Sequence, residues 1–389
     1  MLEVFRRVGF RPRACGWELT LRCNLRCKHC GSLAGRARDD ELSRDECLRV
    51  ADELAEMRCE RVTLTGGEPT LHAAWDELAE RLVKQKVQVG LISNAWEWSS
   101  GQAERAARAG LYAVGFSLDG LEQEHDAFRA PGSFARVVDA IRITRGAGLD
   151  VAINTTIHRL NRKQLPDMRR LLIDLGAHSW QLQIAIPTGA MAGHRELVLA
   201  PEDLLWLVPQ IAEFCRDSNR HLRVVASDHI GYFGKPEAHL RQPDVSMPFW
   251  LGCWAGLHVF GIESNGNVKG CLSLPSALHG ESGYVEGNLR ESSLREIWNR
   301  PTGFAYSRGF RVAALKGFCR VCRYGDLCRG GCTWKRYSQG NSEAGDTYCF
   351  YFQAMQHECY DLLEDEPTDE EKAYFRASPD VPLGEKQGN

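Results

Sequence analysis

The feature that most restricts the fold is a regular alternation of short apolar runs with amphipathic stretches between residues 17 and 228. The runs have the length and β-branched content of strands, and the stretches have the period of helices. Expected strands cover 17–21, 62–65, 87–92, 113–118, 151–157 and 181–186, and expected helices cover 44–57, 74–85, 102–109, 133–147, 162–175 and 201–219. This alternation predicts an α/β fold with a parallel sheet, and six such units fit a partial (β/α)6 barrel.

The remainder of the chain divides by composition. Residues 229–250 are rich in Gly and Pro and show no clear period, so we expect a linker there, after a barrel that spans 1–228. The cysteine-rich segment 251–360 has too few long apolar runs to fold on packing alone, and bound metal clusters would have to supply its core. Residues 361–389 are mostly acidic and polar and are expected to form a flexible tail.

Charge and hydropathy exclude two classes of partner. Lys and Arg total 48 against 51 for Asp and Glu, so the chain has no positive excess that would attract nucleic acid or acidic lipid. No apolar stretch approaches the roughly 20 residues of a membrane helix, and residues 1–15 lack the apolar core of a signal peptide. We therefore expect a cytoplasmic protein.

The fifteen cysteines are the second strong constraint. A reducing cytoplasm disfavours disulfides, so clustered thiols there indicate metal binding or catalysis. Three groups are patterned, and Cys349 follows the last of them: 23, 27 and 30; 253 and 271; 319, 322, 328 and 332. Cys15, Cys47, Cys59, Cys215 and Cys359 are scattered and are expected to pack as small apolar residues.

Unusual polar loops follow the carboxyl ends of the expected strands. Cys23-x3-Cys27-x2-Cys30 follows the first strand, and Gly66-Gly67-Glu68-Pro69 follows the second; later strands lead to Ser93-Asn94, Asp119-Gly120 and Pro187-Thr188-Gly189, and Asn154 lies within the fifth. In TIM-like barrels these ends meet on one face, where active sites are built. One pocket is predicted.

The first cysteine triplet suits a 4Fe-4S cluster. Three thiolates on a short loop can hold three irons, which leaves the fourth iron open to a substrate or cofactor. The alternative is a zinc site that uses His29 as its fourth ligand. Structural zinc usually takes spaced pairs rather than one crowded triplet, so the spacing favours iron and sulfur.

The sequence CNLRCKHC after one strand and TGGEPT after the next resembles the radical S-adenosylmethionine (SAM) superfamily. The resemblance implies that SAM chelates the open iron and is cleaved to a 5'-deoxyadenosyl radical, which abstracts a hydrogen atom from substrate. It implies that Gly66, Gly67, Glu68 and Pro69 hold the methionine amino group, and it places Ser93, Asn94, Ser117, Asp119 and Asn154 at SAM contacts. Simple turn or capping roles remain the alternative for these last five, and no residue is assigned a catalytic role beyond the cluster.

The stretch from His125 to Phe134 also matches a loop that recurs in this superfamily. Within it, the default interpretation of Arg129 is a surface arginine at the entry to a helix. The alternative is that Arg129 pairs with the SAM carboxylate.

The second cysteine set consists of Cys319-x2-Cys322-x5-Cys328-x3-Cys332, with Cys253-x12-Gly266-x4-Cys271 before it and Cys349 after it. This pattern resembles the SPASM domain. That resemblance implies two auxiliary 4Fe-4S clusters, three in the whole chain. The distal cluster would be bound by Cys319, Cys322, Cys328 and Cys349, and the proximal one by Cys253, Cys271 and Cys332. Some relatives have a further cysteine where this chain has 246–252, so the proximal cluster is expected to have three cysteine ligands. Structural zinc is again the alternative.

The resemblance narrows the substrate in part. Sulfatase-activating relatives have Asp where Leu272 follows Cys271, so formylglycine formation is not expected, and Gly31-Ser32 is typical of peptide maturases. The first hypothesis is a maturase that crosslinks or epimerises a ribosomally made peptide. A haem-type tetrapyrrole precursor as substrate, or a non-catalytic metal-binding scaffold, are the alternatives. About sixteen residues precede the first strand, so a peptide leader would dock on the barrel, on the SPASM segment or on a separate leader-binding protein; the expected reductant is a flavodoxin or ferredoxin.

Overall fold

One curved sheet organises the computed structural model, which describes residues 2–218, 221–241, 250–276, 283–340 and 345–377. The strands follow the order β10-β9-β8-β1-β2-β3-β4-β5-β6-β7 across the sheet. Their bounds are β1 Ala14–Glu18, β2 Arg61–Thr65, β3 Gln88–Ser93, β4 Ala113–Ser117, β5 Asp150–Ile157, β6 Ser179–Ile184, β7 Arg223–Ala226, β8 Val259–Ile262, β9 Asn267–Lys269 and β10 Val285–Asn288. All pairings from β8 through β1 to β7 are parallel, and β8, β9 and β10 pair antiparallel.

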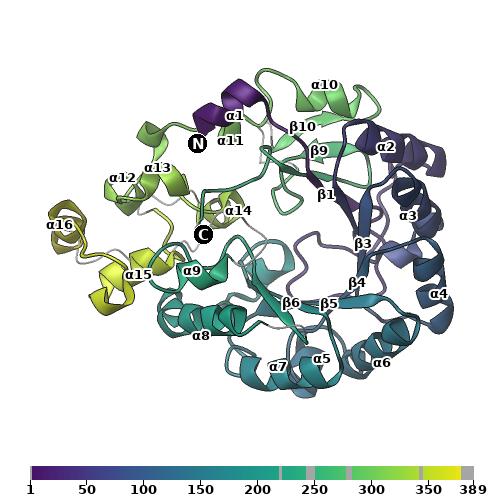
Figure 1. Cartoon of the computed structure of the whole chain (residues 1–389), viewed down its shortest axis with the longest axis horizontal. Coiled ribbons are helices and arrows are strands. Elements are labelled where there is room, and N and C mark those ends of the chain that lie inside the picture. Colours follow the sequence, from purple (N-terminus) through teal and green to yellow (C-terminus); the bar gives the residue numbers. More distant parts are fainter. Residues whose placement is uncertain (1, 219–220, 242–249, 277–282, 341–344, 378–389) are drawn as a thin grey trace.

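Helices cover the outside of this sheet (Figure 1). Those of the barrel are α2 Arg44–Glu56, α3 Trp75–Lys84, α4 Ser100–Arg108, α5 Glu122–Phe128, α6 Ser133–Gly146, α7 Leu165–Asp174 and α8 Leu204–Arg216. The others are α1 Leu2–Val8, α9 Glu237–Leu240, α10 Leu294–Trp298, α11 Ala305–Arg308, α12 Phe318–Val321, α13 Gly325–Cys328, α14 Thr333–Ser338, α15 Phe350–Gln356 and α16 Asp369–Ala377. The predicted α/β alternation is confirmed.

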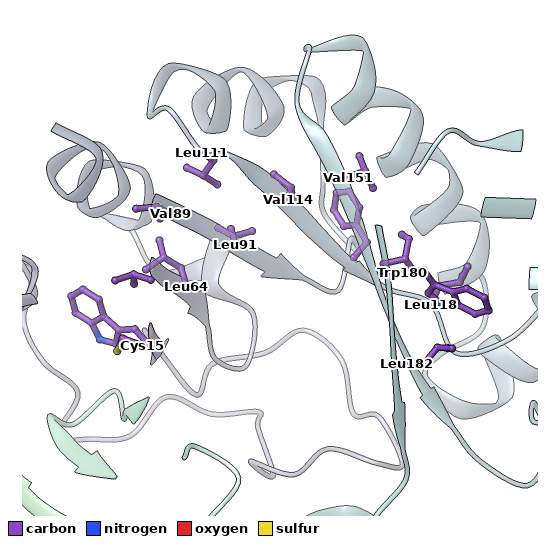
Figure 2. Close-up of a cluster of buried hydrophobic side chains, with 14 of the residues drawn as sticks. Cys15, Leu64, Val89, Leu91, Leu111, Val114, Leu118, Val151, Trp180 and Leu182 are labelled. Atoms are coloured by element: carbon purple, nitrogen blue, oxygen red, sulfur yellow. The ribbon is translucent and has the colours of Figure 1, made fainter. Parts of the chain in front are cut away.

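The core lies where the strands meet the helices, and Figure 2 shows part of it. Leu64, Val89, Val114, Val151 and Trp180 come from successive strands, and all are completely buried. Burying a side chain of this size contributes roughly 1.5–3 kcal/mol relative to its exposed state. Because every barrel strand contributes such residues to the same core, the strand ends are held in fixed relative positions.

The first strand begins earlier than predicted, at Ala14 instead of residue 17. Its residues Ala14–Gly16 lack β-branched side chains, so they carry no strand signal of their own. Pairing on both sides decides the outcome, because Cys15 lies opposite Val62 on β2 and opposite Phe260 on β8. Four-residue β7 was not predicted at all, since so short a run does not stand out from its surroundings.

The predicted linker and tail also differ from the structure where residues are described. Tyr232, Phe233 and Trp250 of the 229–250 stretch are buried, and residues 242–249 lie outside the described residues. Part of the predicted tail forms α16, whose Glu371 is fully buried and accepts hydrogen bonds from the backbone N–H groups of Arg323 (3.0 Å) and Thr368 (2.8 Å). The aromatic residues at the end of α16 pack against Phe318. Residues 378–389 of the predicted tail lie outside the described residues.

The cysteine-rich segment joins the barrel through continuous strand pairing. Strand β8 lies beside β1, and the buried Glu18 at the end of β1 accepts hydrogen bonds from the N–H and the hydroxyl of Ser264 (both 3.1 Å). Outside the sheet, Arg290 donates to the Glu46 carboxylate of α2 at 2.7 and 3.1 Å. This guanidinium, followed by hydrogen bonding from Ser43, lowers the pKa of Glu46 to about 2. The division at 229–250 remains a prediction.

The ion pair between Glu46 and Arg290 should contribute measurably to stability. In a double-mutant cycle with Glu46→Gln and Arg290→Met, we expect a coupling energy of about 0.2–1 kcal/mol at neutral pH and low salt, because both groups are partly exposed. The coupling should decrease at high salt. Urea unfolding of the four proteins measures it, and a coupling of zero at low salt would contradict a role for this pair in joining the two halves.

Candidate functional site

Two strand-end loops touch through their backbones at the mouth of the barrel. Gly67 and Glu68 donate their N–H groups to the carbonyl oxygens of Thr20 (2.7 Å) and Arg22 (2.8 Å), just before the cysteine triplet. A Cβ built on Gly66 would lie 2.4 Å from the Thr20 oxygen, and one on Gly67 would lie 2.4 Å from the Arg22 oxygen. Gly66 also has a φ of +154°. Glycine is therefore required at both positions by close backbone approach.

Glu68 ties the second strand end to the third. Its carboxylate is buried, and it accepts hydrogen bonds from the Thr70 hydroxyl (2.6 Å) and from the Asn94 N–H (2.7 Å). Burial raises the pKa of Glu68, and these hydrogen bonds oppose the rise. The side chain of Asn94 then reaches back to Asn24 inside the cysteine loop at 2.8 Å. The loops after β1, β2 and β3 consequently form one connected unit.

The three thiols of the first triplet lie on one loop and receive several donors. Burial raises the pKa values of Cys23 and Cys27, and the neighbouring Cys30 raises both further. N–H groups point at the sulfur atoms from Leu25 (3.4 Å) and Asn94 (3.6 Å) to Cys23, from Arg129 (3.8 Å) to Cys27 and from Ala34 (3.2 Å) to Cys30. Donors around iron-bound sulfur are what a cluster site requires.

A buried ion pair between Asp119 and Arg129 lies against the same cysteine loop. The side chains of Asp119 and Arg129 have exposed fractions of 0% and 8%, and the Arg129 Nε lies 2.6 Å from the Asp119 Oδ2. Burial alone would raise the pKa of Asp119, but the Arg129 guanidinium brings it to about 2. Asp119 also accepts the N–H of Thr156 at 2.6 Å. Its carboxylate is thus occupied by protein groups, and the surface interpretation of Arg129 is wrong.

His29 completes this support as a neutral ring. It stacks on Phe128 with centroids 4.4 Å apart and planes 5° apart, and burial lowers its pKa to about 3. The Arg129 Nη2 lies 3.2 Å from the His29 Nε2, so that nitrogen must accept and the ring proton lies on Nδ1. The buried Nδ1 has no hydrogen-bond partner among the described residues. A donor is left free beside the cysteine triplet.

The remaining predicted SAM contacts lie along neighbouring strand ends. Ser93 is buried at the end of β3, and its hydroxyl accepts the N–H of Ala95 at 3.0 Å, which is a turn role. Ser117 and Asn154 are paired across β4 and β5. Pro69 is buried and opens a 3-10 turn, Pro69–Leu71. Every predicted SAM contact except Asn154 therefore lies at the carboxyl end of a strand from β2 to β4 or in the loop that follows it. Asn154 lies inside β5, opposite the last residue of β4.

The predicted proximal ligands lie close together although they are far apart in sequence. Burial raises the pKa of Cys332, and the Cys253 and Cys271 thiols raise it further. The Cys253 thiol also raises the pKa of Cys271. The three thiols therefore lie near enough to one another to affect each other's ionisation.

The predicted distal ligands line a single cavity. Cys319, Cys322, Cys328 and Cys349 all contribute to its wall, together with aromatic rings such as Tyr351. Burial raises the pKa values of Cys322, Cys328 and Cys349 well above the usual value for a thiol. Thiols in such surroundings ionise only when a metal is bound.

Tyr232, which the sequence analysis assigned to a linker, connects the two auxiliary groups. Its hydroxyl accepts the N–H of Cys332 at 3.0 Å and donates to the carbonyl of Asp228 at 2.9 Å. The Cys349 thiol lies 3.9 Å from its carbonyl oxygen. The only signal in the sequence is an aromatic pair inside a Gly-rich stretch, which does not distinguish a buried residue from a loop residue.

Zinc needs its sulfur ligands about 2.3 Å from one centre. Among the described residues, no three His, Cys, Asp or Glu side chains are arranged around a single metal ion in this way.

Two family models match the chain. One is described as the Radical SAM superfamily and matches residues 17–172, and the other is described as an iron-sulfur cluster-binding domain, SPASM, and matches residues 253–323. These ranges contain the first triplet and the start of the second cysteine set. In the described parts of the chain, no helix combines the length and apolar character that a membrane crossing requires.

Similar proteins differ in their printed activities. An AdoMet-dependent heme synthase of Methanosarcina barkeri is 29% identical over 87% of this chain and 97% of the relative. The mycofactocin maturase MftC of Mycolicibacterium smegmatis is 30% identical over 87% of this chain and 83% of the relative. The structure of Streptococcus suis SuiB bound to S-adenosylmethionine superposes with a TM-score of 0.69 at 18% identity, over 89% of this chain and 78% of SuiB. This last likeness concerns the fold alone.

The close approach at Gly67 generates a direct test. We expect Gly67→Ala to lower the free energy of unfolding by about 1–3 kcal/mol, because its methyl group would overlap the backbone carbonyl of Arg22. Gly146→Ala is the matched control, since nothing lies within 4 Å of a Cβ at that helical position. Urea unfolding and iron content measure the effect. Equal stability and equal iron content in the two variants would contradict the constraint.

Proposed function

Because the chain belongs to the radical SAM superfamily, we propose that it cleaves SAM at the Cys23, Cys27 and Cys30 loop and modifies a ribosomally made peptide by hydrogen abstraction. The observation that carries this proposal is the joining of that loop to the GGEP loop through two backbone hydrogen bonds. Cys23, Cys27 and Cys30 would hold a 4Fe-4S cluster, which would supply the electron for cleavage of the sulfonium cofactor. The protein's own residues supply the position and the surroundings.

The protein groups have distinct proposed tasks. Gly66 to Pro69 and the neighbouring strand ends hold the amino group and the rest of SAM, while the free Nδ1–H of His29 is available to an acceptor on the bound cofactor. The neutral state of His29 matters, because a cation beside Arg129 would repel it. The Asp119 carboxylate keeps Arg129 against Cys27, so the guanidinium remains near the cluster sulfur.

The auxiliary clusters are assigned in the same proposal. Cys319, Cys322, Cys328 and Cys349 hold the distal cluster, and Cys253, Cys271 and Cys332 hold the proximal one with three cysteine ligands. Support comes from the shared cavity of the first four thiols and from the mutual proximity of the other three. Residues 246–249, in the stretch where some relatives have a further cysteine, lie outside the described residues.

Cleavage of SAM can be tested without knowing the substrate. We expect anaerobically reconstituted protein with a strong reductant to form 5'-deoxyadenosine, and Cys27→Ala to reduce its formation to background, because one iron loses its thiolate. Cys359→Ala is the matched control, since this thiol belongs to none of the three groups. Chromatography with mass detection measures the product. Equal product from wild type and Cys27→Ala would overturn the assignment.

A peptide is the proposed substrate. The mycofactocin maturase resembles this chain over most of its length, and SuiB has been solved with its precursor peptide SuiA on a similar fold. A separate leader-binding protein is proposed to present the peptide, and a flavodoxin or ferredoxin to reduce the clusters. All fifteen cysteines are unpaired, which supports a reducing, cytoplasmic location.

A tetrapyrrole precursor is the second candidate. The observation that favours it is the match to the heme synthase of Methanosarcina barkeri, which extends over 97% of that relative. The same SAM cleavage would serve both substrates, so the choice depends on what enters the barrel mouth.

Mass spectrometry distinguishes the two candidates. We expect co-expression with a candidate precursor peptide to remove two hydrogens from the peptide if a crosslink forms, or to introduce deuterium from heavy water if a centre is inverted. The parallel incubation uses a haem-type tetrapyrrole that carries propionate side chains. A mass change in the tetrapyrrole alone would contradict the peptide assignment and support the second candidate.

A further inference from the structure

Tyr306 has a buried hydroxyl that the proposed function does not use. It lies on the short helix α11, and its oxygen is buried without a hydrogen-bond partner among the described residues. Buried hydroxyls in native proteins almost always have a partner, so an unpartnered one indicates a position that faces a bound group.

The hydroxyl lies at the proximal cysteine group. A Cβ built on Gly270 would be 1.8 Å from the Tyr306 oxygen, so the phenol rests on the residue directly before Cys271. Burial raises the pKa of Tyr306, and Cys253 followed by Glu286 and Cys271 raises it further. The contact with Gly270 therefore places this oxygen beside Cys271, and the effect of Cys253 on the phenol agrees with a position at the same cysteine group.

The neighbours of Tyr306 hold its ring in place. Phe304, at the start of α11, is fully buried with a φ of +54°, and Arg308 lies over its ring at 4.4 Å. The Arg308 side chain also donates to the carbonyls of Gly256 (2.7 Å) and Trp298 (2.6 Å). Because both ends of the short helix are held in this way, the Tyr306 side chain keeps its position beside Gly270.

We propose that the Tyr306 hydroxyl donates a hydrogen bond to a sulfur atom of the proximal cluster and makes that cluster easier to reduce. The proposal rests on the proposed ligand set of Cys253, Cys271 and Cys332. Hydrogen bonds to cluster sulfur are among the factors that set the potential, because they stabilise the extra negative charge of the reduced state. The phenol O–H is a hydrogen-bond donor, and the sulfur atoms of a cluster carry the negative charge that would accept it.

Tyr306→Phe removes only the oxygen, so the cluster should assemble as in the wild type. We expect two changes in the proximal cluster: a more negative reduction potential, and loss of a proton coupling that exchanges in heavy water. Potentiometric titration followed by electron paramagnetic resonance measures the potential, and electron-nuclear double resonance measures the coupling. The proximal signal is the one that Cys253→Ala lacks.

Tyr284→Phe is the matched control. The Tyr284 ring packs edge-on against Tyr306 at 5.0 Å, so this variant removes a hydroxyl from the neighbouring ring and should leave both readouts unchanged. Equal potentials and an unchanged exchangeable proton in Tyr306→Phe would overturn the inference, as would an iron-tyrosinate vibration in the wild type. Iron and sulfide amounting to fewer than three clusters, with no signal that depends on Cys253, would instead overturn the ligand set and the inference with it.

Discussion

The site depends on one close backbone contact, where the loop after β2 meets the loop after β1. The N–H groups of Gly67 and Glu68 donate to carbonyl oxygens just before Cys23. The two backbone segments approach so closely that no side chain fits between them. This contact sets where the cysteine loop lies relative to the residues proposed to hold SAM. A cofactor that must be bound by an iron and by a protein loop at once needs these two elements in a fixed relation.

Buried charge extends this constraint from β1 and β2 to β4. An ion pair as deeply buried as Asp119 with Arg129 contributes little net stability, because both groups lose their hydration. The pair instead orients the Arg129 guanidinium. It holds one nitrogen of the guanidinium against the Cys27 thiol and another against the His29 Nε2, which accepts a hydrogen bond. The ring stacking of His29 on Phe128 then holds the imidazole plane. Stability and positioning are therefore served by different contacts.

The sequence predicts regular elements well and isolated contacts poorly. Strand and helix positions in the barrel follow from periodicity, and the cysteine groups follow from spacing, because both patterns repeat along the chain. The placement of Arg129 does not follow from the sequence, because the sequence favours a surface arginine at the entry to a helix, whereas the structure buries the side chain against Asp119. Tyr232 and Tyr306 are harder still, because the cysteines near them are distant in sequence: Tyr306 is 35 residues from Cys271, and Tyr232 is 100 from Cys332 and 117 from Cys349. Only the folded chain brings these residues together. Helix α16 was not predicted because its Glu371 is acidic and typical of an exposed tail. In the structure this carboxylate accepts a hydrogen bond from the backbone N–H of Arg323, which is 48 residues earlier in sequence.

The pairing of β8 with β1 has a consequence for the architecture as a whole. A barrel strand in this position would otherwise present a row of unpaired amides and carbonyls, which invites association between molecules. Here the cluster-bearing half of the chain covers that edge with its own strand. The two halves therefore behave as one hydrogen-bonded frame at this seam, and relative hinge motion across it would break the ladder.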